Sequence, residues 1–273
     1  MREKFLAISG ISLANRASVR GFSCLLARPK LGLILCLLLL LAQADVFGDV
    51  GQSSNSRGSI TKRSQNYLAE TTHELRRVLG YQPKTAVELE FVDLQQYASK
   101  VGKNSWAHAV YFNNKITIAL RPELSRSRNR LRRLIRHETL HAAVDLISDS
   151  QCPAWFEEGL ALLFEGGHKR ALSRALSDYL RERNPISLHQ LEVNFAGLDK
   201  PLAEVAYGQS YFAVQSLVHR FGFSGIRKYL SSLGAGRGEK GAFYSAFGMN
   251  LSEFEQQLGV QLKLWTNGGR DEF

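Results

Sequence analysis

The sequence predicts an α+β fold in which a small, strand-containing half is followed by an all-helical half. Two observations lead to this prediction. One alternating run and two β-rich runs lie between residues 87 and 120, whereas helical periodicity dominates after about residue 150. The chain has 273 residues, of which 44% are hydrophobic. This is enough for one domain of ordinary size or two small ones, and it argues against global disorder.

The N-terminus, residues 1–44, has the pattern of a secretory signal peptide. Arg28 and Lys30 precede an uninterrupted apolar run at 31–42, and a small-x-small site ends at Ala44. The run has 12 residues and spans about 18 Å as a helix, short of the hydrocarbon core of about 30 Å. We therefore expect an exported protein, periplasmic or secreted. A retained N-terminal anchor, and with it membrane association, is the second choice.

The net charge of +10 is inflated by the same segment. Residues 1–44 hold six of the 35 basic and one of the 25 acidic residues, which leaves 29 and 24 and a net charge of +5. This mild surplus gives no reason to expect a nucleic-acid partner. Cleavage after Ala44 leaves Cys152 as the sole cysteine, so no internal disulfide is expected and Cys152 is interpreted as a small, partly buried apolar residue.

The predicted domain occupies residues 65–268 and follows a linker. Residues 45–64 are rich in Ser, Gly and Asn and have little apolar periodicity, which is typical of a flexible linker. A helix is expected over 65–80, because its apolar residues recur at helical spacing. Residues 87–92 alternate apolar and acidic side chains, as a half-buried strand does. Asp93 is then a candidate N-cap for a short helix.

A hairpin and a series of helices complete the predicted elements. The β-rich runs 107–112 and 115–120 are joined by Asn113-Asn114, which is a hairpin signal. A long helix is expected next, with Ser125 or Ser127 as its N-cap, and it ends at about Ile147. Further helices are expected at 154–165, 170–183, 203–221, 223–233 and 251–264, with a Gly-rich loop at 234–238. The strand-containing half therefore ends at about residue 150.

The long helix carries the residues that point to chemistry. His137 and His141 are four residues apart, which puts both imidazoles on one helix face, about one turn apart. Two neutral imidazoles suit zinc, which a catalytic site holds with three protein ligands and one water. Glu138 lies on the same turn as His137 and can take a proton from that water. The segment therefore predicts a zinc site with Glu138 as general base.

A second segment supplies the third predicted ligand. Residues 153–161, PAWFEEGLA, place carboxylates in an apolar context, where a carboxylate is costly unless it is paired or metal-bound. The segment resembles the W-x-x-E-G-x-A pattern of gluzincin peptidases, and residues 65–268 as a whole resemble the peptidase MA-like group. The resemblance implies a zincin-type catalytic domain with a small mixed sheet, one Zn²⁺ per chain and Glu158 as the ligand beside the two histidines. Glu157 is the rival ligand. If it does not bind the metal, it is expected at a solvated helix position.

The resemblance also implies further roles, each with a plain structural alternative. Aminopeptidase-type gluzincins stabilise the oxyanion with a tyrosine of the helical half, and Tyr207 stands in the corresponding segment, with Tyr211 as the fallback. The alternative is a packed tyrosine, since the Lys and Gly of that pattern are absent. The strand at 115–120 corresponds to an edge strand that binds the substrate backbone, or is an ordinary strand. Asp145 is a candidate to orient an imidazole or is a solvated acid, and Leu162 replaces an acid of the thermolysin pattern.

Seven arginines crowd the approach to the motif, from Arg121 to Arg136. Such a cluster can attract anionic lipid head groups, acidic substrates or an acidic polymer. Leu131, Leu134 and Ile135 interrupt it at helical spacing, which favours the solvated face of a long helix.

Together these features predict an exported zinc metallopeptidase that acts on peptide or protein substrates. Endopeptidase activity is favoured, because the G-x-M-E-N segment of the aminopeptidases is absent from the sequence. The alternative is a non-catalytic zinc-binding or envelope assembly protein with a peptidase-like fold. Hydrolysis of an amide in cell-wall material is a third option for the same site.

Overall fold

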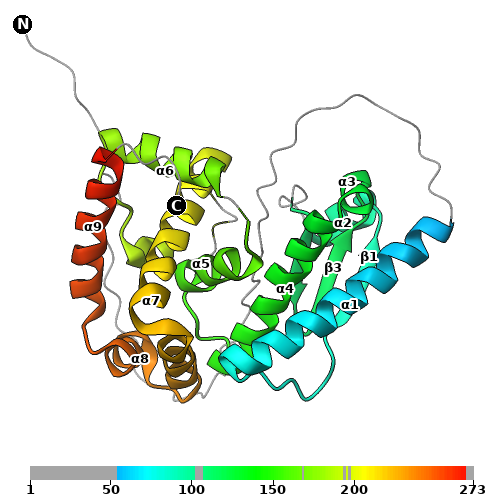
Figure 1. Cartoon of the computed structure of the whole chain (residues 1–273), viewed down its shortest axis with the longest axis horizontal. Helices are drawn as coiled ribbons and strands as arrows, with labels where there is room; N and C mark the ends of the chain where they lie inside the picture. Colours follow the sequence, from blue (N-terminus) through cyan, green and yellow to red (C-terminus); the bar gives the residue numbers. More distant parts are fainter. Residues whose placement is uncertain (1–53, 102–106, 168, 193–194, 196–197, 269–273) are drawn as a thin grey trace, which may run out of the picture. The chain divides into compact units, whose positions relative to one another are not determined.

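A computed structural model of the chain describes residues 54–101, 107–167, 169–192, 195 and 198–268. The predicted signal peptide at 1–44 lies outside these residues. The described elements confirm an α+β fold, with three strands near the start and helices after them (Figure 1). Among the described helices, none is both long and apolar enough to cross a membrane.

Three short strands form one mixed sheet. They are β1 (Glu88–Val92), β2 (Ala109–Phe112) and β3 (Lys115–Ala119), in the order β1-β3-β2. The hairpin β2–β3 is antiparallel, and its turn residues Asn113 and Asn114 have φ values of 49° and 61°. Positive φ at both central residues is what a two-residue hairpin turn needs, and Asn adopts it readily. The predicted hairpin is therefore confirmed.

The sheet order places β3 at the centre. Strand β3 pairs in parallel with β1 on one side and antiparallel with β2 on the other. The prediction that residues 115–120 form an edge strand is therefore wrong. In the hairpin alone, β3 would have one unpaired side. Strand β1 pairs with that side in parallel, and the chain between β1 and the hairpin passes through α2 (Leu94–Val101). In the described sheet, β2 is an edge strand with one unpaired side.

Helices cover both faces of the sheet. On one face, α1 (Ser54–Leu79) and α4 (Arg128–Ser148) pack against β3. Their shared apolar core contains Ile60, Ile116, Ile118, Leu131 and Ile135, among others. On the other face, Tyr97 and Val101 of α2 form a smaller cluster with Val92, Val110 and Ala119. Successive side chains of a strand point to opposite faces of the sheet, so the strands contribute to two separate apolar cores.

Helix α1 begins eleven residues earlier than the sequence predicts, at Ser54. Ile60 is 2% exposed and belongs to the core beneath α4, and Ser64 is fully buried one turn later. Residues 54–64 are therefore helical and not part of a linker. A single isoleucine among polar residues was too weak a periodic signal, and the helix is held there by tertiary packing.

Two caps define the ends of α4. Ser127 lies between α3 (Pro122–Arg126) and α4, and its side chain accepts a hydrogen bond from the Arg130 amide at 3.3 Å. Ser127 is thus the N-cap, whereas Ser125 lies within α3. Asp149 ends the helix in a left-handed conformation with φ of 50°. The two caps therefore fix where α4 begins and ends.

The remaining elements are helical. They are α5 (Ala154–Glu165), α6 (Arg170–Glu182), the 3₁₀ helix η2 (Leu188–Leu191), α7 (Lys200–Gly234), α8 (Gly238–Phe247) and α9 (Leu251–Asn267). The bounds of α5 are those predicted. The two helices predicted at 203–221 and 223–233 both lie within α7, which is broken between them at Gly222, where φ is 64° and ψ is −179°. The predicted division is therefore confirmed. Helix α8 was not predicted, because its apolar residues follow a Gly-rich stretch.

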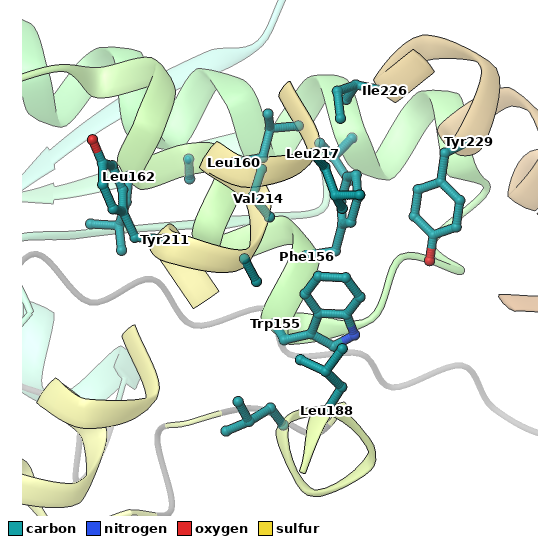
Figure 2. Packing of buried hydrophobic residues seen from close by; sticks show 14 of the residues in the cluster. Trp155, Phe156, Leu160, Leu162, Leu188, Tyr211, Val214, Leu217, Ile226 and Tyr229 are labelled. Atoms are coloured by element: carbon teal, nitrogen blue, oxygen red, sulfur yellow. The ribbon is translucent and has the colours of Figure 1, made fainter. Parts of the chain in front are cut away.

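Helix α5 packs against both α4 and α7. Gly159 permits this approach, since a Cβ built on it would lie 2.2 Å from the carbonyl oxygen of Ser210 in α7. At its start, Trp155 and Phe156 are fully buried, and the Phe156 ring lies 4.5 Å from that of Tyr229 (Figure 2). The partly buried Cys152 packs against this core, in keeping with its interpretation as an apolar residue. Helix α5 is thereby held rigidly beside the motif helix.

Candidate metal centre

The two motif histidines lie side by side on the buried face of α4. His137 and His141 are both 0% exposed, and their ring centroids are 5.0 Å apart. The one-turn spacing brings the rings together, and the packing of α5 onto α4 closes the face that carries them. The histidines therefore lie within the protein interior, away from bulk water.

Glu158 of α5 completes a group of three. Its Oε2 atom lies 3.7 Å from Nε2 of His137 and 3.9 Å from Nε2 of His141, too far for hydrogen bonds. The three ligand atoms all lie within 4.8 Å of one another, and among the described residues this is the group that fits a metal ion. Nε2 of His137 is buried with no hydrogen-bond partner in the described structure. Two imidazoles and one carboxylate are a donor set that suits Zn²⁺.

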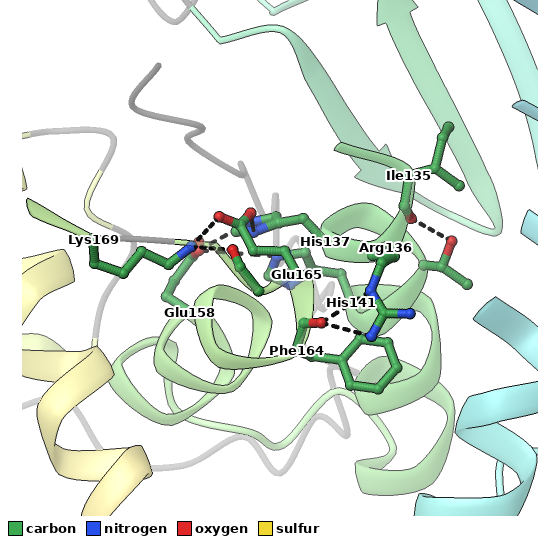
Figure 3. Close-up of polar contacts among 10 residues, drawn as sticks. Ile135, Arg136, His137, His141, Glu158, Phe164, Glu165 and Lys169 are labelled. Atoms are coloured by element: carbon green, nitrogen blue, oxygen red, sulfur yellow. Dashed lines mark hydrogen bonds and ion pairs between the residues drawn. The ribbon is translucent and has the colours of Figure 1, made fainter. Parts of the chain in front are cut away.

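The outer nitrogen of each imidazole is held by a second carboxylate. Nδ1 of His137 lies 2.8 Å from Oε2 of Glu165 (Figure 3). Nδ1 of His141 lies 2.8 Å from Oε1 of Glu157. A carboxylate can only accept, so in the neutral ring Nδ1–H is the donor and Nε2 keeps its lone pair. Both lone pairs are then available to a metal on the side where Glu158 lies.

These contacts correct two sequence-based interpretations. Glu157, the rival ligand, is 3% exposed, bonds the opposite nitrogen of His141, and is neither a ligand in this group nor a solvated residue. Asp145 does not orient an imidazole. It accepts hydrogen bonds from the hydroxyls of Tyr111 at 3.1 Å and Ser150 at 2.5 Å instead.

Glu165 is the functional residue that sequence reasoning missed. Its carboxylate bonds an imidazole, which is the role expected of the acid that Leu162 replaces in the thermolysin pattern. A usable signal was present, because Glu165 follows Glu158 by seven residues, which is two helical turns and the same face. One helix, α5, therefore presents the candidate ligand Glu158 and both carboxylates that bond the imidazoles to α4.

The centre is rich in buried negative charge. The carboxylates of Glu138, Glu157, Glu158 and Glu165 are at most 6% exposed. Burial lowers the pKa of His137, but the carboxylates of Glu158 and Glu165 outweigh this effect and raise it to about 10. The centre thus draws a positive charge to the imidazoles, either a proton or a metal ion that displaces it.

Glu138 lies beside the three ligands without bonding to any of them. It is fully buried, and neither carboxylate oxygen has a hydrogen-bond partner in the described structure. Burial raises the pKa of Glu138 to about 7, against the lowering effect of the two imidazoles. The backbone of Tyr111 also lowers that pKa, which indicates that the edge strand β2 lies close to this carboxyl.

The two candidate tyrosines differ in their surroundings. Tyr207 is fully buried, and its ring packs edge-on against Phe195 with centroids 5.1 Å apart. The hydroxyl of Tyr211 accepts a hydrogen bond from Nε2 of Gln215 at 3.3 Å. Burial raises the pKa of Tyr211, and the Glu165 carboxylate raises it further, so Tyr211 has an electrostatic link to the centre. A catalytic role for either tyrosine stays a prediction.

The arginine cluster is partly structural. Arg136 makes two hydrogen bonds to Glu74 of α1, at 2.5 and 3.2 Å, and donates to the Phe164 carbonyl of α5. Arg132 pairs with Glu70 of α1 at 3.7 Å. The prediction of a solvated helix face is therefore wrong for Arg136. Its side chain links α4 to α1 and α5.

Comparison with known proteins gives one match. Residues 69–263 match a family model described as Peptidase MA superfamily. No curated protein and no solved structure matches the chain.

Proposed function

Because this chain belongs to the peptidase MA superfamily, we propose that it is a zinc-dependent metallopeptidase that cleaves peptide bonds within protein substrates. One observation carries the proposal: His137, His141 and Glu158 converge from two helices beside the buried carboxyl of Glu138. The peptidase function follows from family membership. Zinc dependence and endopeptidase activity are the proposed refinements.

The three ligands would hold one zinc ion, with Glu157 and Glu165 fixing the imidazoles. Bound zinc lowers the pKa of a water molecule and polarises the substrate carbonyl. With zinc bound, Glu138 would act as the general base, and it would return the proton to the leaving amine, so that the carboxylate is regenerated. The burial of its carboxyl beside His137, His141 and Glu158 supports this role.

The edge strand β2 is the proposed place for the substrate backbone. Tyr111 of β2 lies close to Glu138, and the neighbouring Phe112 is 48% exposed. An extended segment added to this edge would run past the general base. Such binding uses backbone groups along the chain and not a free terminus, which supports internal cleavage. Tyr207 is proposed to donate a hydrogen bond to the developing oxyanion, with Tyr211 as the alternative.

Export is proposed from the N-terminal pattern alone. The basic flank, the apolar run at 31–42 and the small-x-small site support cleavage after Ala44. N-terminal sequencing of the protein purified from a secretory host tests this. A mature chain that starts at Asp45 agrees with the proposal, and an intact N-terminus in the membrane fraction indicates an anchor.

The decisive experiment compares the parent with Glu138→Gln on a mixed peptide library. We expect the parent to hold about one zinc per chain. We expect Glu138→Gln to retain the zinc and lose about 10²- to 10⁴-fold in cleavage rate. Glu70→Gln, an exposed change on α1, is the matched control. Zinc binding without cleavage by the parent would instead support a binding or assembly protein.

A further inference from the structure

A buried lysine stands behind the metal centre. The chain leaves α5 through Gly166 and Gly167, whose φ values of 75° and 84° turn it back towards the helix end. Lys169 follows this turn, and its side chain is 7% exposed. Lysine is rarely this buried unless its ammonium group is paired. Nζ of Lys169 donates to Oε1 of Glu165 and, at 2.9 Å, to the carbonyl oxygen of Gly166.

The lysine and the histidine bond different oxygens of the same carboxylate. Oε1 of Glu165 accepts from Lys169, and Oε2 accepts from Nδ1 of His137 (Figure 3). The Glu165 carboxylate is thus held at both oxygens and cannot rotate without losing one bond. A buried chain of contacts runs from the ammonium group through Glu165 to His137, whose Nε2 lies opposite Glu158.

The contacts described for the second histidine differ. His141 bonds Oε1 of Glu157, but no lysine or arginine pairs with Glu157 within the described ranges. The two imidazoles are therefore supported unequally, and the cationic anchor belongs to His137 alone in the described part of the chain.

We propose that Lys169 is a positioning residue for the metal centre. It holds the Glu165 carboxylate on Nδ1 of His137 and thereby strengthens zinc binding by His137, His141 and Glu158. The inference rests on the proposed zinc site and adds a residue outside its ligands. Supporting partners of this kind change metal affinity by on the order of 10- to 100-fold.

A double-mutant cycle tests the proposal on the full mature chain. The variants are Lys169→Met, Glu165→Gln and the pair, with Lys169→Arg as the conservative replacement. Lys228→Met, an exposed change on α7, is the matched control. The zinc dissociation constant is measured by competition with a chelator. The visible absorption of the Co²⁺-loaded protein reports the ligand geometry separately from activity.

We expect Lys169→Met to weaken zinc binding on the order of 10-fold or more and to alter the Co²⁺ spectrum. Lys169→Arg should restore most of the affinity, and Lys228→Met should leave it unchanged. In the Glu165→Gln background, Lys169→Met should have little further effect, because its route to His137 is already broken.

Three results would overturn the proposal. They are an unchanged affinity in Lys169→Met, an equal effect of Lys169→Met in both backgrounds, and no rescue by Lys169→Arg. If Lys169→Met fails to reach the native near-ultraviolet circular dichroism spectrum, Lys169→Gln replaces it in the cycle. A parent chain that binds no zinc rejects the proposed function as well. A parent that binds zinc with any of the three results rejects this inference alone.

Discussion

At the scale of single residues, each imidazole of α4 lies between a carboxylate that bonds its Nδ1 and the carboxylate of Glu158, which faces its Nε2. Nδ1 of His141 bonds Glu157 at 2.8 Å, while its Nε2 lies 3.9 Å from Glu158. Hydrogen bonding to a carboxylate fixes the tautomer and the ring orientation, and it increases the basicity of the other nitrogen. Loss of a supporting glutamate should therefore weaken metal binding on the order of 10- to 100-fold.

Glu157→Gln tests this at the histidine without a lysine anchor. We expect zinc affinity to fall on the order of 10- to 100-fold, because the amide is a weaker partner for Nδ1–H. Asp145→Asn is the matched control, since Asp145 bonds Tyr111 and Ser150 and not an imidazole. Chelator competition measures both constants. Equal losses in the two variants would contradict the assignment of Glu157 as the supporting residue.

Spacing alone was enough to predict part of this centre. His137, Glu138 and His141 follow from helical geometry, and Glu158 follows from its apolar context and the resemblance. The contacts of Glu157, Glu165 and Lys169 depend on how α5 faces α4 and how the chain turns after α5. A single sequence does not contain this information directly, because distant parts of the chain set the rotation of each helix.

At the scale of elements, the position of Glu158 depends on the close crossing of α5 and α7. Gly159 follows Glu158 directly, and a Cβ there would lie 2.2 Å from the Ser210 carbonyl oxygen. Real Cβ atoms do not approach backbone oxygen this closely, so any larger residue must push the helices apart. The glycine of the E-G pair therefore allows the packing that presents the ligand.

Gly159→Ala should cost at least about 2 kcal/mol in the free energy of unfolding and also weaken zinc binding. Gly259→Ala in α9 is the control, because no atom lies within 4 Å of its added Cβ. That change should stabilise the protein by up to about 1 kcal/mol through helix propensity. Urea unfolding measures both. A neutral Gly159→Ala would mean that α5 and α7 are less closely packed than described.

The early start of α1 gives a second element-scale prediction. Ile60 is 2% exposed in the core beneath α4. Ile60→Ala should therefore cost about 2 kcal/mol or more in unfolding free energy. Lys62→Ala, at an exposed position of the same helix, should change it by less than about 0.5 kcal/mol. Equal, negligible effects at both positions would restore the linker interpretation of residues 54–64.

Local signals predicted elements better than they predicted partners. The Asn113-Asn114 turn and helix 154–165 were predicted correctly, because turn chemistry and apolar periodicity act within a few residues. The place of β3 in the sheet was predicted wrongly, since it depends on a crossover through α2. The start of α1 was missed, because its stability comes from packing on α4 and not from its own composition.

At the scale of the whole molecule, the centre joins the two halves predicted from sequence. His137 and His141 belong to α4, which covers the sheet, and Glu158 belongs to α5 of the helical half. A metal held by both helices binds the folded chain and not the unfolded one. Zinc should therefore stabilise the protein as a unit.

Removal of zinc should lower the melting temperature of the whole domain. At zinc 100-fold above its dissociation constant, the stabilisation is about 2.7 kcal/mol. For a domain of this size that corresponds to about 5 to 10 °C. Scanning calorimetry with and without chelator measures the shift. His141→Gln should show almost no response to chelator, and a full response in that variant would place the metal elsewhere.

The most direct test of the central claim is the X-ray absorption spectrum at the zinc edge of the purified mature protein. The arrangement of His137, His141 and Glu158 predicts a first shell of nitrogen and oxygen at about 2.0 to 2.1 Å, with the outer-shell scattering of two imidazoles. A sulfur neighbour at about 2.3 Å, or scattering from fewer than two imidazoles, would contradict the assignment of the metal centre.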